Sequence, residues 1–158
     1  MKKFLWTLLM LCAPLMALEN LEGRLSAEFK IDDKALCPIK NVPLKAHRDW
    51  LGVLQFKDGS LVWVSSPKYT FAYLYGESLK NEAGVHAVYL TDHATGRLVQ
   101  TVNAHYVFGS TLMSVGGDDI IPFAQKADAE AFAAKNHGKK IYTIERIDKR
   151  FIDYLDMR

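Results

Sequence analysis

Cysteine and histidine are the side chains of this sequence best suited to chemistry, and their spacing predicts no catalytic site. The 158 residues include two cysteines, Cys12 and Cys37, and five histidines. The histidines are scattered, with no two at the spacing of a metal-ligand pair: His47, His86, His93, His105 and His137. The sequence also has no Ser/His/Asp arrangement, phosphate-binding loop or zinc motif. It therefore predicts a protein that is not an enzyme.

The first 17 residues have the order of a secretory signal peptide. Lys2 and Lys3 give a positive start, residues 4–13 are apolar, and Pro14 interrupts this run before the small residue Ala17. The apolar run is shorter than the roughly 20 residues that a membrane-spanning helix needs. We therefore expect cleavage near Ala17 and a soluble periplasmic protein.

Cys12 offers an alternative fate, a lipoprotein anchored in the membrane and facing the periplasm. A lipid-attachment cysteine normally follows a small residue, whereas Leu11 precedes Cys12. Release is therefore favoured over the anchor, which would give loose membrane association.

Cleavage would leave Cys37 as the single cysteine of the mature chain. A single thiol cannot form an internal disulfide, and in an oxidising compartment it is a liability unless it is buried or holds something. Cleavage would also remove Lys2 and Lys3, reducing 20 basic side chains to 18, which equals the 18 acidic ones. A neutral chain without a basic block predicts no nucleic-acid partner.

The elements that must position Cys37 begin with a predicted hairpin. Residues 50–56 and 61–64 are apolar and β-prone, and they flank Asp58-Gly59, a strong turn signal because glycine accepts a positive φ. Ser66-Pro67 then predicts a helix start that ends at Gly76. Residues 85–90 are predicted to form a third strand.

The second half is predicted to repeat this order of elements. Two strands are expected at residues 97–102 and 104–108, followed by a glycine-rich loop at 109–119. A helix at 126–136, a strand at 140–144 and a terminal helix at 145–155 complete this half. The fold class is therefore α+β, with two consecutive ββαβ units and a C-terminal helix. We assign residues 1–17 to the signal peptide, 18–49 to a loose N-terminal arm with a short strand near 27–31, 50–92 to the first unit and 93–158 to the second unit.

Three short motifs in the second half occur in the order of a known family. They are Ala104-His105-Tyr106-Val107-Phe108-Gly109-Ser110, the turn Ile121-Pro122-Phe123-Ala124, and Asp128-Ala129-Glu130-Ala131-Phe132-Ala133 followed by His137-Gly138. The chain therefore resembles the NosL family of nitrous-oxide reductase accessory proteins. The resemblance implies paired ββαβ units related to organomercurial lyase. It also implies a periplasmic carrier of Cu(I) that passes the metal toward apo-nitrous-oxide reductase through a membrane transporter complex.

The resemblance places candidate copper ligands at Cys37, Met113 and His47. The family has a cysteine followed by a methionine in this part of the N-terminal arm, but here Ile39 or Val42 stands in the methionine position. A second family methionine matches Gly116, and Met113 lies a few residues earlier in the same loop. Thiolate and thioether suit soft Cu(I), and imidazole is acceptable to copper.

Each candidate also has a structural interpretation. Cys37 is equally well explained as a buried structural thiol, and Met113 as a packing residue. His47 is a candidate because it is the histidine nearest to Cys37 in the sequence. The alternative function is therefore a periplasmic interaction or scaffold module that has lost the copper site. A carbon–mercury lyase is not expected, because it would need a second thiol.

Overall fold

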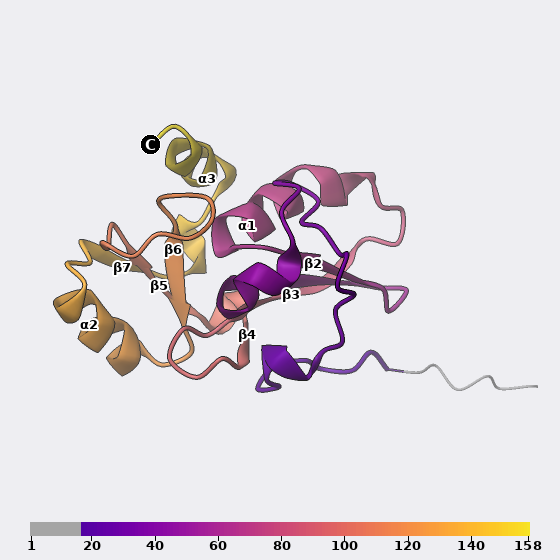
Figure 1. Ribbon diagram of the computed structural model, residues 1–158, viewed down its shortest axis with the longest axis horizontal. Helices are drawn as coiled ribbons and strands as arrows, with labels where there is room; N and C mark the ends of the chain where they lie inside the picture. Colours follow the sequence, from indigo (N-terminus) through magenta and orange to yellow (C-terminus); the bar gives the residue numbers. More distant parts are fainter. Residues whose placement is uncertain (1–16) are drawn as a thin grey trace, which may run out of the picture.

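Two antiparallel sheets lie side by side and organise the chain (Figure 1). The computed structural model describes residues 17–158. The first sheet has the strand order β2-β1-β3-β4, with β1 at Gly52–Phe56, β2 at Leu61–Val64, β3 at Val85–Thr91 and β4 at Leu98–Gln100. The second sheet has the order β6-β5-β7, with β5 at His105–Phe108, β6 at Ile120–Phe123 and β7 at Lys140–Tyr142.

The local signals of the first unit are confirmed. Gly59 has φ +86° in the turn between β1 and β2, where its N–H donates to the Phe56 carbonyl at 2.9 Å. Helix α1 spans Pro67–Tyr75, and the Ser66 hydroxyl accepts the Tyr69 N–H at 3.3 Å as its N-cap. Gly76 follows the last helical residue.

The second unit repeats the topology of the first. Helix α2, at Lys126–Lys135, connects β6 to β7 as α1 connects β2 to β3. In both units the first strand is central, with the hairpin partner on one side and the last strand on the other. The predicted α+β class with two ββαβ units is therefore confirmed, although four of the expected features differ.

The strand expected at residues 97–102 belongs to the first sheet. It is β4, which pairs with β3 through Tyr89↔Gln100, Leu90↔Val99 and Thr91↔Leu98. The turn expected at Ile121-Pro122-Phe123-Ala124 is wrong, because Ile120–Phe123 is the fully buried strand β6. Since β6 is an edge strand, Pro122 can lie in it without removing a hydrogen bond of the sheet interior.

The terminal helix and the N-terminal arm also differ from expectation. Helix α3 spans Lys149–Asp156 rather than 145–155, because the Asp148 carboxylate caps it by accepting the Phe151 N–H at 2.8 Å. The arm has a 3-10 turn at Ser26–Glu28 instead of a strand. It is not loose: the Gly23 N–H donates to the Leu98 carbonyl at 2.7 Å, and the Leu98 N–H donates to the Arg24 carbonyl at 2.8 Å.

One core cluster joins the two halves. Phe71 of α1 and Leu90 of β3 pack with Tyr106 of β5, Ile120 of β6 and Leu155 of α3. Figure 1 shows α3 lying next to α1, with α2 on the far side of the second sheet. Within residues 17–158, no helix has the length and apolar character needed to cross a membrane.

Candidate metal-binding site

Cys37 begins a tight loop of the N-terminal arm, residues 37–42, which we call the cysteine loop. The Cys37 N–H donates to the Val42 carbonyl, and the Asn41 N–H donates to the Cys37 carbonyl, both at 2.8 Å. Asn41 adopts φ +57°, a left-handed conformation that asparagine tolerates better than most residues. Backbone hydrogen bonds therefore fix the position of Cys37.

The Cys37 side chain is buried, with 1% of its surface exposed. It belongs to a hydrophobic cluster whose other buried members are Ile31, Leu44, Leu51, Leu54, Phe56, Val64, Tyr69 and Val88. A thiol buried to this extent lacks the solvent access of a reactive cysteine. In this conformation Cys37 is a packing residue.

The glycine-rich loop, residues 109–119, reaches the same region through Tyr69. Val115 packs against the cluster that contains Cys37. A Cβ atom on Gly116 would lie 2.9 Å from the Tyr69 ring, so this backbone is in close contact with Tyr69. The Lys40 Nζ lies 5.9 Å from the centre of the same ring. The cysteine loop and the glycine-rich loop therefore both lie against Tyr69.

Met113 lies on this loop but faces solvent, with 60% of its surface exposed. Two anchors flank it: the Thr111 N–H donates to the Asn136 carbonyl at 2.9 Å, and Ser114 and Gly117 form a small bridge. The structure thus brings the loops of Cys37 and Met113 to one region, with one side chain buried and the other exposed.

His47 lies half-buried in a 3-10 segment, Leu44–Trp50, at a kink with φ −127°. In the part of the chain that the structure describes, no group of three or more His, Cys, Asp or Glu side chains is arranged to hold a metal ion.

Lys68 occupies the space beside Gly116, the position that matches a family methionine. The Lys68 side chain is 2% exposed, and its Nζ donates to the Gly116 carbonyl at 2.6 Å and pairs with the Asp156 carboxylate at 3.1 Å. A side chain added at Gly116 would meet Lys68 Cε at 3.0 Å. A methionine at this position would therefore require Lys68 or Tyr69 to move.

Asp119 holds the end of the glycine-rich loop to the start of α1. Its Oδ1 accepts the N–H groups of Lys68 and Ile120, both at 2.8 Å, and its Oδ2 accepts the Ser114 hydroxyl at 2.6 Å. Burial raises the pKa of Asp119 from 3.8 to about 6, against the lowering effect of these hydrogen bonds. Neither Lys68 nor Asp119 was singled out from the sequence, since nothing local marks a charged residue as buried.

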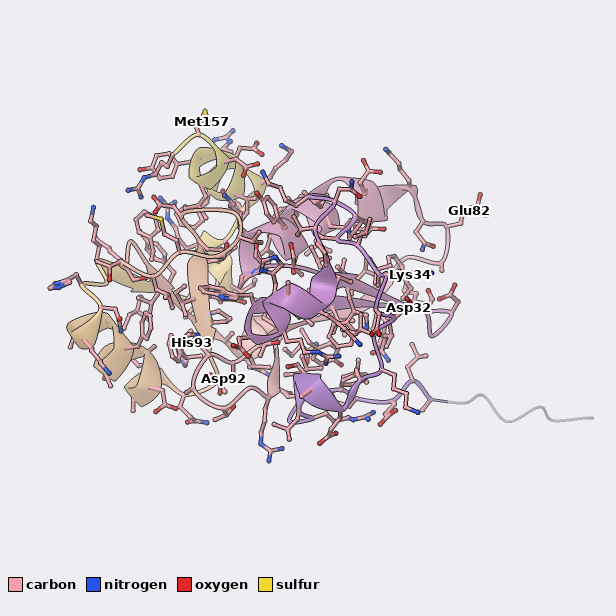
Figure 2. The ribbon with its side chains drawn as sticks, in the orientation of Figure 1. Asp32, Lys34, Glu82, Asp92, His93 and Met157 are labelled. Atoms are coloured by element: carbon pink, nitrogen blue, oxygen red, sulfur yellow. The ribbon has the colours of Figure 1, made fainter. Side chains whose placement is uncertain are left out.

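His93 is a third residue whose setting the sequence did not predict. Its ring contacts three aromatic rings, with centroid distances of 5.9 Å to Trp50, 5.8 Å to Phe123 and 5.1 Å to Phe132. Desolvation lowers the pKa of His93, opposed by the charges of Asp92 and Asp49. Figure 2 shows His93 beside α2 and the second sheet, where its ring packs among these aromatic side chains.

Comparison with known proteins gives one family. Residues 28–152 match the NosL family, whereas no curated protein matches in a sequence search. A crystal structure of the copper chaperone NosL from Shewanella denitrificans is similar, with a TM-score of 0.63 and 22% identity over 77% of this chain and 96% of that chain. A solution structure of the apo-NosL protein from Achromobacter cycloclastes is also found, with a TM-score of 0.42 and 20% identity over 64% and 87% of the two chains. The match over 28–152 covers most of the sequence, and the chain belongs to the NosL family.

Proposed function

We propose that this protein is a periplasmic Cu(I) carrier that assists the metallation of nitrous-oxide reductase. The observation that carries the proposal is the family match over residues 28–152. It is supported by a fold like that of the Shewanella denitrificans copper chaperone. The acceptor of the metal would be the reductase or the transporter complex that assembles its copper site. The carrier itself would be non-enzymatic.

The donors available fit Cu(I) in their chemistry. Cys37 would supply a thiolate and Met113 a thioether, both soft ligands, and His47 a neutral imidazole. The contact of both loops with Tyr69 supports a shared site, because Cys37 and Met113 belong to these two loops. Cys37 is buried, so holding the metal requires the cysteine loop or the glycine-rich loop to move until Met113 and Cys37 face each other.

A second candidate is a NosL-like interaction or scaffold module without a copper site. The burial of Cys37 among apolar side chains favours it. So does Gly116, because Lys68 and Tyr69 fill the space that a methionine there would need. In this case the protein would act through contacts with other proteins.

A Cu(I) titration distinguishes the copper carrier from the scaffold module. It uses the reduced chain from residue 18 onward and a competing chelator. The carrier is expected to bind one equivalent tightly, because a thiolate and a thioether together hold Cu(I) better than one donor. Binding should be lost in Cys37→Ser and in Cys37→Ala and weakened in Met113→Ala. The matched control is Met157→Ala, which removes an 80% exposed thioether at the end of α3 and should leave binding unchanged.

The variants also locate the site. Loss in the Cys37 variants alone, with Met113→Ala unaffected, would indicate an open site that a partner protein completes. Unchanged binding in both Cys37 variants would contradict the copper site as placed here and favour the scaffold module. The circular dichroism spectrum of each variant shows whether it has kept the fold.

A further inference from the structure

A pocket of about 530 Å³ opens between the second sheet and α3, separate from the cysteine loop and Tyr69. It lies beside β5, β7 and α3, which supply its lining residues together with the segment before α3. We call it the aromatic–arginine pocket, and its residues are Phe108, Tyr142, Arg146, Asp148, Arg150, Phe151 and Tyr154.

Aromatic rings form the floor of this pocket. The Phe151 ring meets the Phe108 ring at 5.4 Å and the Tyr142 ring at 5.5 Å, both edge to face. The Tyr154 ring lies 6.5 Å from Phe151 and is 45% exposed. Phe151 is 8% exposed and forms the bottom of the pocket, so the half-buried Phe108 and Tyr142 rings and the exposed Tyr154 ring offer the surface on which another large apolar side chain can pack.

Guanidinium groups surround the rings. The Arg146 Cζ lies 5.9 Å from the Tyr142 ring and 6.0 Å from the Phe151 ring, and the Arg158 Cζ lies 5.5 Å from the Phe108 ring. Arg158 is paired with Asp118 at 3.1 Å. Arg146 and Arg150 are exposed and form no ion pair with any side chain of residues 17–158. Their donors are therefore open to a ligand.

The one carboxylate in the pocket is already engaged. Asp148 accepts the Phe151 N–H at 2.8 Å as the N-cap of α3, where the helix dipole also favours its negative charge. Elsewhere on α3, Lys149 and Asp153 pair with each other at 2.7 Å. The pocket therefore presents a net positive charge over an aromatic floor.

We propose that the aromatic–arginine pocket binds an acidic segment of a partner protein. A large apolar side chain of that segment would pack on Tyr142 and Tyr154, above Phe151, and its carboxylates would bind Arg146 and Arg150. Arginine suits this role because its planar guanidinium binds carboxylates in a bidentate manner. Tyrosine, phenylalanine, methionine and arginine are the residue types enriched at protein interfaces. Met157, 80% exposed, follows the C-terminal end of α3 (Figure 2). The proposal does not depend on copper binding.

NMR titration of the chain from residue 18 onward with designed peptides tests this. The probe is an acetylated and amidated pentapeptide with phenylalanine at its centre and two glutamates on each side. We expect shifts of the Arg146 and Arg150 side-chain N–H signals and of the Phe151 and Tyr154 ring signals, with binding weakened by salt. Replacing the glutamates by glutamines, or the phenylalanine by alanine, should weaken binding about tenfold or more.

The matching protein variant is Arg146→Gln with Arg150→Gln, which should also lose about tenfold in affinity. Arg48→Gln, in the arm, is the control and should bind like the parent. The proposal is overturned if the glutamine peptide binds as well as the glutamate peptide. It is also overturned if the double variant keeps full affinity, or if vesicles with anionic phosphatidylglycerol bind this surface and the peptide does not. Copper titration of the double variant should be unchanged, which separates this site from the proposed carrier function.

Discussion

Lys68 and Asp119 are buried charged side chains at the junction of three segments. Lys68 joins α1 to the glycine-rich loop and to the end of α3, through Gly116 and Asp156. Asp119 joins the same loop to the N-terminus of α1. Buried charges are stabilised only when their hydrogen bonds are made, so these contacts fix the loop that carries Met113.

Asp119 should make the stability of the protein depend on pH. Its pKa is about 6 in the folded chain, against 3.8 as its usual value, so between these two values the folded state binds more protons than the unfolded state. The free energy of unfolding therefore falls as pH rises through this window, with an Asp119 contribution on the order of 3 kcal/mol. An asparagine side chain cannot titrate, so Asp119→Asn should remove this contribution when urea unfolding is measured from about pH 4 to about pH 7.

Asp153→Asn is the control for that measurement, because Asp153 is exposed and pairs with Lys149 on the surface. It should leave the pH dependence close to that of the parent. Equal pH slopes in the parent and Asp119→Asn would show that Asp119 does not carry the effect.

Among the elements, the β1–β2 hairpin follows from two residues of sequence. The Asp58 carboxylate accepts the Ser60 N–H at 2.9 Å, and Gly59 takes φ +86°. The same carboxylate accepts the Ser60 hydroxyl. The hydroxyl bond first, and then the N–H bond, lower the pKa of the exposed Asp58 carboxyl. The turn therefore forms from local interactions.

Substitution at Gly59 should destabilise the protein according to how well the new residue accepts a positive φ. Gly59→Val is expected to lower the free energy of unfolding by about 2 kcal/mol, because a β-branched side chain resists the left-handed region. Gly59→Asn is the matched variant and should cost less, since asparagine visits that region. Chemical denaturation of both variants measures the difference, and an equal cost for the two would argue against φ as the cause.

At the scale of the whole molecule, the N-terminal arm is bonded into the fold from its first turns. The Glu19 carbonyl accepts the Gln55 side-chain N–H at 3.0 Å, and Leu21 is 3% exposed in the cluster behind the first sheet. Cleavage near Ala17 would therefore leave these contacts intact. The predicted signal peptide lies almost wholly in residues 1–16, outside the described part of the chain.

We expect the mature protein in the periplasm to begin next to Ala17, because residues 1–17 have the charge and apolar order of a signal peptide. Mass spectrometry of the protein isolated from the periplasm would show this N-terminus. A diacylglyceryl group on Cys12 would instead identify the lipoprotein, and Cys12→Ala provides the control, since it should abolish only that product.

The sequence alone determined the features that depend on neighbouring residues. The Asp58-Gly59 turn, the Ser66-Pro67 start of α1 and the glycine stop after it follow from backbone preference and local hydrogen bonds. The motif order in residues 104–138 was enough to indicate the family that the comparison confirms.

Tertiary structure decided which strands share a sheet and which polar side chains are buried. Pro122 belongs to a strand only because β5 pairs with it at a sheet edge, and β4 joins the first sheet because β3 and the arm offer it partners. The burial of Cys37 and Lys68 depends on segments far apart in the chain, which meet at Tyr69. Such contacts cannot be predicted from residue type and local spacing. Solvent exclusion depends on how the whole chain packs, not on the neighbouring residues in the sequence.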